Sequence, residues 1–86
     1  MNLYNISIEQ QELLKTLDDT IGMTAYAVAE TAAIYYGHPI KTASQYAAKG
    51  LVSMEGYGLC RRMDARRPVL WLRTEQGTAY LEANLR

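Results

Sequence analysis

Apolar residues recur at helical spacing near the start of the chain. One face of a helix is formed by four residues that lie three or four positions apart: Leu13, Leu14, Leu17 and Ile21. The preceding residues from Ser7 to Gln10 have the pattern of a capping box, in which each of these two side chains accepts a hydrogen bond from the backbone of the other residue. We therefore expect a first helix from about Ile8 to Asp19, before Gly22 breaks the pattern.

A stripe of small residues predicts a second helix. Thr24 is a suitable N-cap for it. Its buried face would be narrow and would let another helix approach closely, because its members are Ala25, Val28, Ala29, Ala32 and Tyr36. The sequence Gly37-His38-Pro39 ends this helix, since glycine supplies a left-handed C-cap and proline cannot continue the helix.

The third helix is expected to start at Pro39 or Ile40 and to end at Gly50. At about 100° per residue, its buried stripe is centred on Ile40 and also contains Ala43, Ser44, Ala47 and Leu51. Four polar residues share the opposite face, with Tyr46 at its edge: Lys41, Thr42, Gln45 and Lys49. This face contains two cations, an amide and a hydroxyl group, and no acid.

After Gly50 the pattern becomes extended. Leu51-Val52 and residues 57–63 predict the first strand of a hairpin, and residues 63–67 predict its turn. Pro68 fits an edge position at the entry of the return strand. Over residues 69–73 the side chains alternate, so one face of the ribbon, with Trp71, should pack on the helices. Thr74 then caps a final helix, whose apolar positions include Ala79, Tyr80, Leu81 and Leu85.

Composition restricts the chain to one domain over residues 1–86, with a single modest core. The net charge is zero, but the charges are unevenly distributed. Residues 1–39 carry one lysine and five acids, whereas residues 40–73 carry seven lysines and arginines and two acids. A bipolar distribution of this kind can provide a surface that faces phosphate on a neutral molecule.

Several functional classes are not supported by the residues present. One histidine, His38, and one cysteine, Cys60, cannot assemble a zinc site, and no spacing supports a catalytic constellation, so we expect neither an enzyme nor a cofactor. A single cysteine suits a reducing cytoplasm, and no stretch reads as a signal peptide or a membrane span. The expected location is the cytoplasm, without membrane partners.

The polar face of the third helix has the chemistry of base readout. Glutamine can pair bidentately with adenine, lysine with guanine or phosphate, and threonine offers a hydroxyl and a methyl group to base edges. The alternative is an ordinary solvated face, but such faces usually mix both signs of charge. Basic residues of the hairpin would extend the same surface, and these are Arg61, Arg62, Arg66 and Arg67. Arg61 and Arg62 are adjacent in the strand and should point to opposite faces.

The order of elements resembles winged helix-turn-helix regulators of the MarR and PadR type. Lys49-Gly50-Leu51-Val52 is similar to the end of their recognition helix. Residues 72–77 followed by Tyr80-Leu81 are similar to their junction between the wing and the last helix. The chain departs from the family in having Arg73 where leucine usually precedes threonine, and in lacking the long extra helices with which MarR-type proteins dimerise. The resemblance implies a minimal winged helix, of phage or mobile-element type.

From these observations we expect an α+β fold: three helices, a two-stranded wing and a C-terminal helix. The expected function is sequence-specific binding of double-stranded DNA in transcription or recombination. The resemblance gives the recognition-helix role to Lys41, Thr42, Gln45 and Lys49, and the wing role to Arg66 and Arg67. The alternative is a protein-interaction module on the same fold that does not bind DNA.

A module this small reads a short site, so a homodimer or a heterologous protein partner is expected. The expected interface is formed by the first and last helices, with Leu3, Tyr4, Tyr80 and Leu85.

Overall fold

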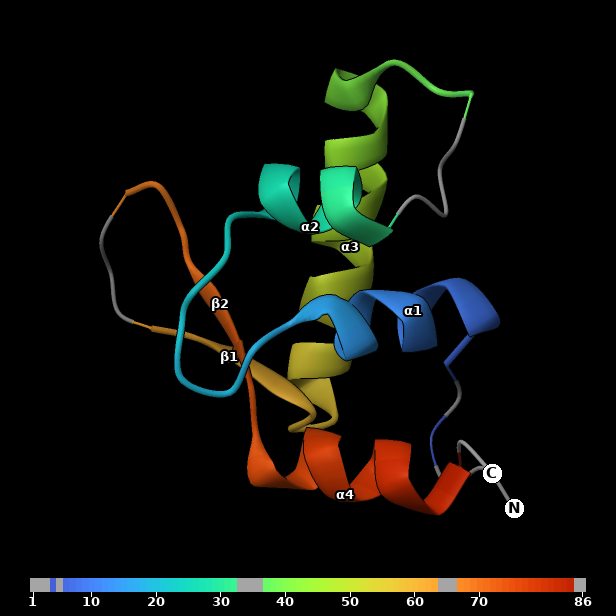
Figure 1. Cartoon of the computed structure of the whole chain (residues 1–86), viewed down its shortest axis with the longest axis vertical. Coiled ribbons are helices and arrows are strands. Elements are labelled where there is room, and N and C mark those ends of the chain that lie inside the picture. The colour runs from blue at the N-terminus through green and yellow to red at the C-terminus, as the bar shows by residue number, and fades with distance from the viewer. Residues whose placement is uncertain (1–3, 5, 33–36, 64–66, 85–86) are drawn as a thin grey trace.

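The order of elements along the chain is the one expected from the sequence. The computed structural model describes residues 4, 6–32, 37–63 and 67–84. In these residues the fold is α+β, with four helices and one antiparallel pair of strands. The elements are α1 (Ile8–Thr16), α2 (Ala25–Ala32), α3 (Ile40–Gly56), β1 (Cys60–Arg62), β2 (Trp71–Arg73) and α4 (Glu75–Asn84). Figure 1 shows α3 along the long axis, the hairpin on one side of it and α4 across its C-terminal end.

The predicted capping box at the start of α1 is confirmed, but the predicted end of this helix is wrong. The Ser7 side chain accepts from the Gln10 backbone N–H at 3.1 Å, and the Gln10 side chain accepts from the Ser7 N–H at 2.7 Å. The helix stops at Thr16 because the Asp18 carboxylate organises a turn, in which it accepts from the backbone N–H groups of Thr20 and Ile21. Ile21, expected on the buried stripe, is therefore 70% exposed.

The second helix is also capped as predicted. The Thr24 hydroxyl accepts from the Ala27 backbone N–H at 3.1 Å. Val28 and Ala29 are buried, and α2 packs against α3 through this narrow face. Tyr36, the last residue of the predicted stripe, lies outside the described residues. Gly37 has a φ of 95°, in the left-handed region that glycine favours, but it lies five positions beyond Ala32, the last residue of α2.

The main error of the sequence-based prediction concerns α3, which continues through Gly50 to Gly56. Gly50 is a point of close contact between helices, since a Cβ there would lie 2.8 Å from Leu13 Cδ1. Leu51, predicted in a strand, is helical and fully buried, and Met54 extends the buried stripe by another turn. Ile40, the expected centre of the stripe, is 37% exposed at the first position of the helix.

The hairpin is confirmed, with shorter strands than predicted. The register pairs Cys60 with Arg73 and Arg62 with Trp71. Met23 pairs with Trp71 from the other edge of β2, through N–H···O bonds of 3.0 and 2.8 Å in the two directions. The α1–α2 connection is thus tied to the hairpin. Trp71 packs into the core as expected.

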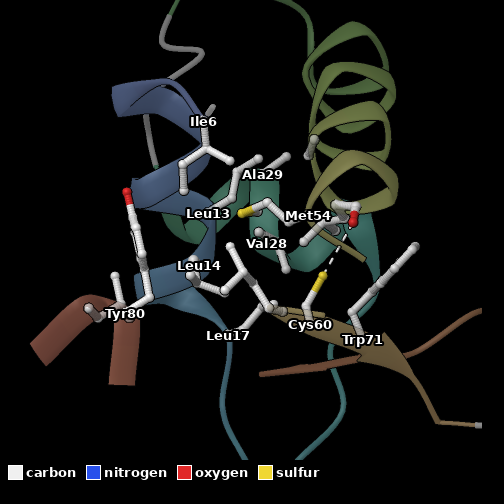
Figure 2. Packing of buried hydrophobic residues seen from close by; sticks show 14 of the residues in the cluster. Ile6, Leu13, Leu14, Leu17, Val28, Ala29, Met54, Cys60, Trp71 and Tyr80 are labelled. Carbon is white, nitrogen blue, oxygen red and sulfur yellow. Dashed lines mark hydrogen bonds between the residues drawn. The ribbon is translucent and has the colours of Figure 1, made fainter. Parts of the chain in front are cut away.

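The core lies between α1, α2, α3 and the hairpin (Figure 2). Leucines of α1 meet Val28, Ala29 and Met54 there, and the Cys60 thiol donates to the Leu51 carbonyl at 3.2 Å. The full cluster is Ile6, Leu13, Leu14, Leu17, Val28, Ala29, Ala43, Ala47, Leu51, Met54, Leu59, Cys60, Trp71, Tyr80 and Leu81. Within the described part of the chain, no helix combines the length and apolar character needed to cross a membrane.

Candidate nucleic-acid interface

The outward face of α3 presents the polar residues that the sequence predicted. Lys41, Gln45 and Lys49 are exposed, and Thr42 is half-buried beside them. They point outward because Ala43, Ala47 and other small or apolar residues of the opposite face are buried against α1 and α2. Packing of that face therefore fixes which side of α3 meets solvent.

The extra turns of α3 lengthen this face without adding an acid to it. At about 100° per residue from Ile40, the outward sector runs from about 100° at Lys41 to about 240° at Tyr46. Val52 and Ser53 fall within the same sector, and both are exposed. Glu55, the one acid of α3, falls outside it at about 60°. We call this sector, over residues 40–56, the outward face.

Among the described residues, no carboxylate forms an ion pair with either lysine of the outward face. The ion pairs among the described residues are Lys15–Glu12, at 3.3 Å, and Arg62–Glu55, at 3.1 Å, and neither involves Lys41 or Lys49. Both lysines are therefore available to an external anion.

A shallow groove borders the outward face on the side of α1. It has a volume of about 440 Å³ and is lined by Ser7, Glu9, Gln10, Tyr46, Lys49 and Gly50. Glu9 is the acid that lines this groove together with Lys49. It forms no ion pair with a described residue, so the groove contains both signs of charge.

Aromatic rings frame the start and the end of α3. His38, in the turn before the helix, is exposed and meets Tyr46 edge to face, with the ring centroids 5.5 Å apart. Tyr57, just after the helix, is exposed and packs on Tyr4 at 5.3 Å. Tyr46 and Tyr57 both reach the surface.

The Arg62 side chain is exposed but makes two contacts within the protein. Its Nε and Nη2 atoms lie 3.3 and 3.1 Å from Glu55 Oε1, and its Cζ lies 5.0 Å from the centre of the Trp71 ring. The arginine thus joins β1 to the last turn of α3. Its predicted contact with DNA would require it to leave Glu55.

Arg61 points to a different side, as predicted for adjacent strand positions. It lines a cleft of about 500 Å³ together with Asp19, Arg73, Glu75, Thr78, Ala79 and Glu82. Three carboxylates border this cleft, so Arg61 faces acids of α4 and of the α1–α2 loop. The structure does not bring Arg61 together with the outward face of α3.

Arg67 lies between the two strands of the hairpin, before β2. Arg67 is exposed and pairs with no described acid. Arg66 lies outside the described residues. Three of the predicted site residues are therefore described cations that form no ion pair with a described acid and do not line the acidic cleft. They are Lys41, Lys49 and Arg67.

Arg73 has a structural role that the sequence reasoning missed. Its Nε donates to Thr78 Oγ1 at 3.0 Å, and its Nη1 donates to the carbonyls of Leu14 and Lys15 at 3.3 and 3.5 Å. These carbonyls belong to the last turn of α1, which lacks partners within the helix. Arg73 therefore caps the C-terminus of α1. The sequence contained one signal for this role, namely that Arg73 stands where the regulators that the chain resembles usually have leucine.

Among the described residues, Asp18 and Cys60 have pKa values that are shifted by their surroundings. The hydrogen bonds from Thr20 and Ile21 hold the pKa of Asp18 below its ordinary value of 3.8, and the nearby charge of Arg73 acts in the same direction. Burial raises the pKa of the Cys60 thiol to about 12, with a further contribution from Glu55. Cys60 bonds to Leu51 and His38 packs on Tyr46, so these two residues form no nucleophilic pair.

One part of the predicted partner surface is wrong. Tyr80 is only 5% exposed, and its ring contacts Tyr4 with the centroids 5.5 Å apart. Its hydroxyl accepts from the Gln11 side chain at 3.2 Å, which ties α4 to α1. Tyr80 therefore holds the monomer together. Leu3 and Leu85 of the same predicted surface lie outside the described residues.

Comparisons of the chain with known protein families, with curated proteins and with solved structures find no match.

Proposed function

We propose that this chain is a winged helix-turn-helix protein that binds double-stranded DNA and regulates transcription or recombination. In this proposal α2, the following turn and α3 form the helix-turn-helix, and the β1–β2 hairpin is the wing. The observation that carries the proposal is the outward face of α3, where unpaired Lys41 and Lys49 flank Gln45 and no acid intervenes. An α-helix fits the major groove, where these side chain types pair with base edges or phosphates.

The dimensions of the face set the size of the site. Lys41 and Lys49 are eight positions apart, which corresponds to about 12 Å along the helix axis. At about 3.4 Å per base pair, α3 would follow three or four base pairs. A site of this length gives little sequence specificity by itself. The proposal therefore includes a second copy of this chain, or a partner protein, bound to the neighbouring DNA.

The unpaired cations set the expected salt dependence. Lys41, Lys49 and Arg67 are unpaired in the structure, and Arg66 adds a fourth charge from the sequence. Four phosphate contacts give a slope of log K against log salt of about −3.6, or roughly a 150-fold loss of affinity between 50 and 200 mM salt. Counting Arg61 and Arg62 as well would give a steeper slope of about −5.4.

Fluorescence anisotropy with a labelled random duplex over this range of salt tests the proposal. We expect binding at 50 mM salt, and a slope that falls to about −1.8 when Lys41→Gln and Lys49→Gln are combined. Lys15→Gln is the matched control, because Lys15 lies on α1 and pairs with Glu12. Absence of wild-type binding at 50 mM salt, or an unchanged slope in the double variant, would refute the proposal.

A protein-interaction module is the second candidate. It is favoured by the internal pairing of Arg62 and by exposed apolar side chains on the outward face, namely Val52, which is 49% exposed, and Tyr46. Aromatic residues together with arginine are typical of the centres of protein interfaces. A protein that fails to bind duplex DNA at low salt while remaining folded would favour this candidate.

A further inference from the structure

The Arg62–Glu55 ion pair joins the two elements of the proposed DNA-binding surface. Glu55 is in the last turn of α3, and Arg62 is the last residue of β1. The carboxylate oxygen Oε1 faces the edge of the guanidinium formed by Nε and Nη2, at 3.3 and 3.1 Å. That edge is one through which an arginine can bind a phosphate bidentately.

The pair lies at the margin of the outward face of α3. Glu55 is at about 60° around the helix, and Val52 lies inside the sector at about 120°. The Arg62 and Glu55 side chains are 46% and 31% exposed, so both are accessible to ions from solvent. A phosphate held between α3 and the hairpin would meet a guanidinium that a carboxylate already neutralises.

We propose that Glu55 competes with DNA phosphate for Arg62, so that this contact inside the protein limits its affinity for DNA. The inference rests on the proposed function. An ion pair as exposed as this one is weak, whereas arginine and phosphate form a strong charge-assisted pair. Phosphate can therefore displace Glu55, but it gains less from Arg62 than from an unpaired cation. Removal of the Glu55 charge releases Arg62 as a further phosphate ligand.

Glu55→Gln removes the charge and keeps the shape of the side chain. We expect this variant to bind a random duplex about two- to five-fold more tightly than wild type, the range typical of an exposed ion pair. The slope of log K against log salt should become more negative by up to about 0.9, the value for one phosphate contact, because Arg62 makes this contact only in part while Glu55 competes for it. Glu12→Gln is the control, since it breaks the Lys15 ion pair on α1 and should change neither quantity.

A double-mutant cycle with Arg62→Gln separates competition from simple repulsion between Glu55 and DNA. If Glu55 acts through Arg62, then Glu55→Gln gives no gain in affinity when Arg62→Gln is already present. If the gain persists in that background, Glu55 repels the phosphates directly and the inference is wrong. Circular dichroism and thermal unfolding of all four proteins confirm that each of them is folded.

The outcomes also distinguish this inference from the proposed function. If folded wild type and all its variants fail to bind duplex DNA at 50 mM salt, the proposed function fails. If wild type binds, but Glu55→Gln changes neither affinity nor salt slope, only the competition between Glu55 and phosphate is refuted.

Discussion

Replacement of Arg73 by methionine tests how the hairpin, α1 and α4 are held together. Methionine keeps much of the aliphatic length and removes the guanidinium. The variant loses the bond to Thr78 Oγ1 at 3.0 Å and the longer bonds to the Leu14 and Lys15 carbonyls at 3.3 and 3.5 Å. The two carbonyls are left at the negative end of the α1 dipole without their cationic partner.

The expected loss of stability follows from these three bonds. A hydrogen bond to a charged group contributes about 1.5–3 kcal/mol. Arg73 is only half-buried and two of its bonds are long, so we expect the whole arrangement to contribute about 2 kcal/mol rather than the sum. For a domain of this size, that loss lowers the unfolding temperature by roughly 10 °C.

Urea and thermal unfolding, followed by the fluorescence of Trp71, measure this effect. Arg61→Met is the matched control, because Arg61 lines the same cleft but its side chain makes no hydrogen bond or ion pair with the described residues. It should lie within about 0.5 kcal/mol of wild type. Arg73→Lys should fall between the two, since an ammonium cannot span the Thr78 hydroxyl and both carbonyls. Equal stability of Arg73→Met and Arg61→Met would show that Arg73 does not cap α1.

Two further predictions concern the glycines of α3 and the turn after α1. Gly50→Ala should destabilise the fold by about 1–3 kcal/mol in urea unfolding, because the new Cβ would meet Leu13 Cδ1 at 2.8 Å. Gly56→Ala is the control. No atom lies within 4 Å of the new Cβ at this position, so the variant should be neutral or slightly stabilised. Equal effects at both positions would contradict the close contact between Gly50 and Leu13. The pKa of Asp18 is depressed on folding, so its carboxylate stabilises the protein above pH 3.8, and that contribution is lost as the pH falls through the folded pKa. Asp18→Asn should therefore be less stable than wild type at pH 7. In unfolding experiments below pH 3.8, the difference in stability between the two proteins should shrink as the pH falls. A constant difference across this range would argue against stabilisation by the Asp18 carboxylate.

Local patterns in the sequence predicted the helix starts well. The Ser7–Gln10 capping box and the Thr24 cap depend on groups three residues apart, so the sequence contains all the information that they need. The order of the elements followed from the same kind of signal. The end of α1 was missed because the Asp18 side chain forms a turn that apolar periodicity does not report.

Gly50 shows where local reasoning failed. A glycine that ends a helix and a glycine that lets two helices touch look the same along the chain. The difference here is Leu13, which lies against Gly50 only in the folded structure. The prediction of a helix end at Gly50 therefore misplaced Leu51 and Val52 into a strand.

The candidate site was predicted in part for a related reason. Lys41, Gln45 and Lys49 share a face because helical geometry fixes their spacing. Arg62 is bound by Glu55, and Arg73 is bound by Thr78 and by carbonyls of α1. Several of these partners are distant in the sequence and come close to the hairpin only in the folded structure. A count of basic residues along the sequence could not separate cations bound inside the protein from those available to a ligand.

Titration of ¹⁵N-labelled protein with a short duplex, followed by amide chemical shifts, tests the central claim most directly. We expect the largest changes on the outward face of α3, at Lys41, Gln45 and Lys49, and at Arg67 in the hairpin, with the amides of α4 unchanged. Absence of any shift at low salt, or shifts centred on the cleft around Glu75 and Glu82, would contradict this claim.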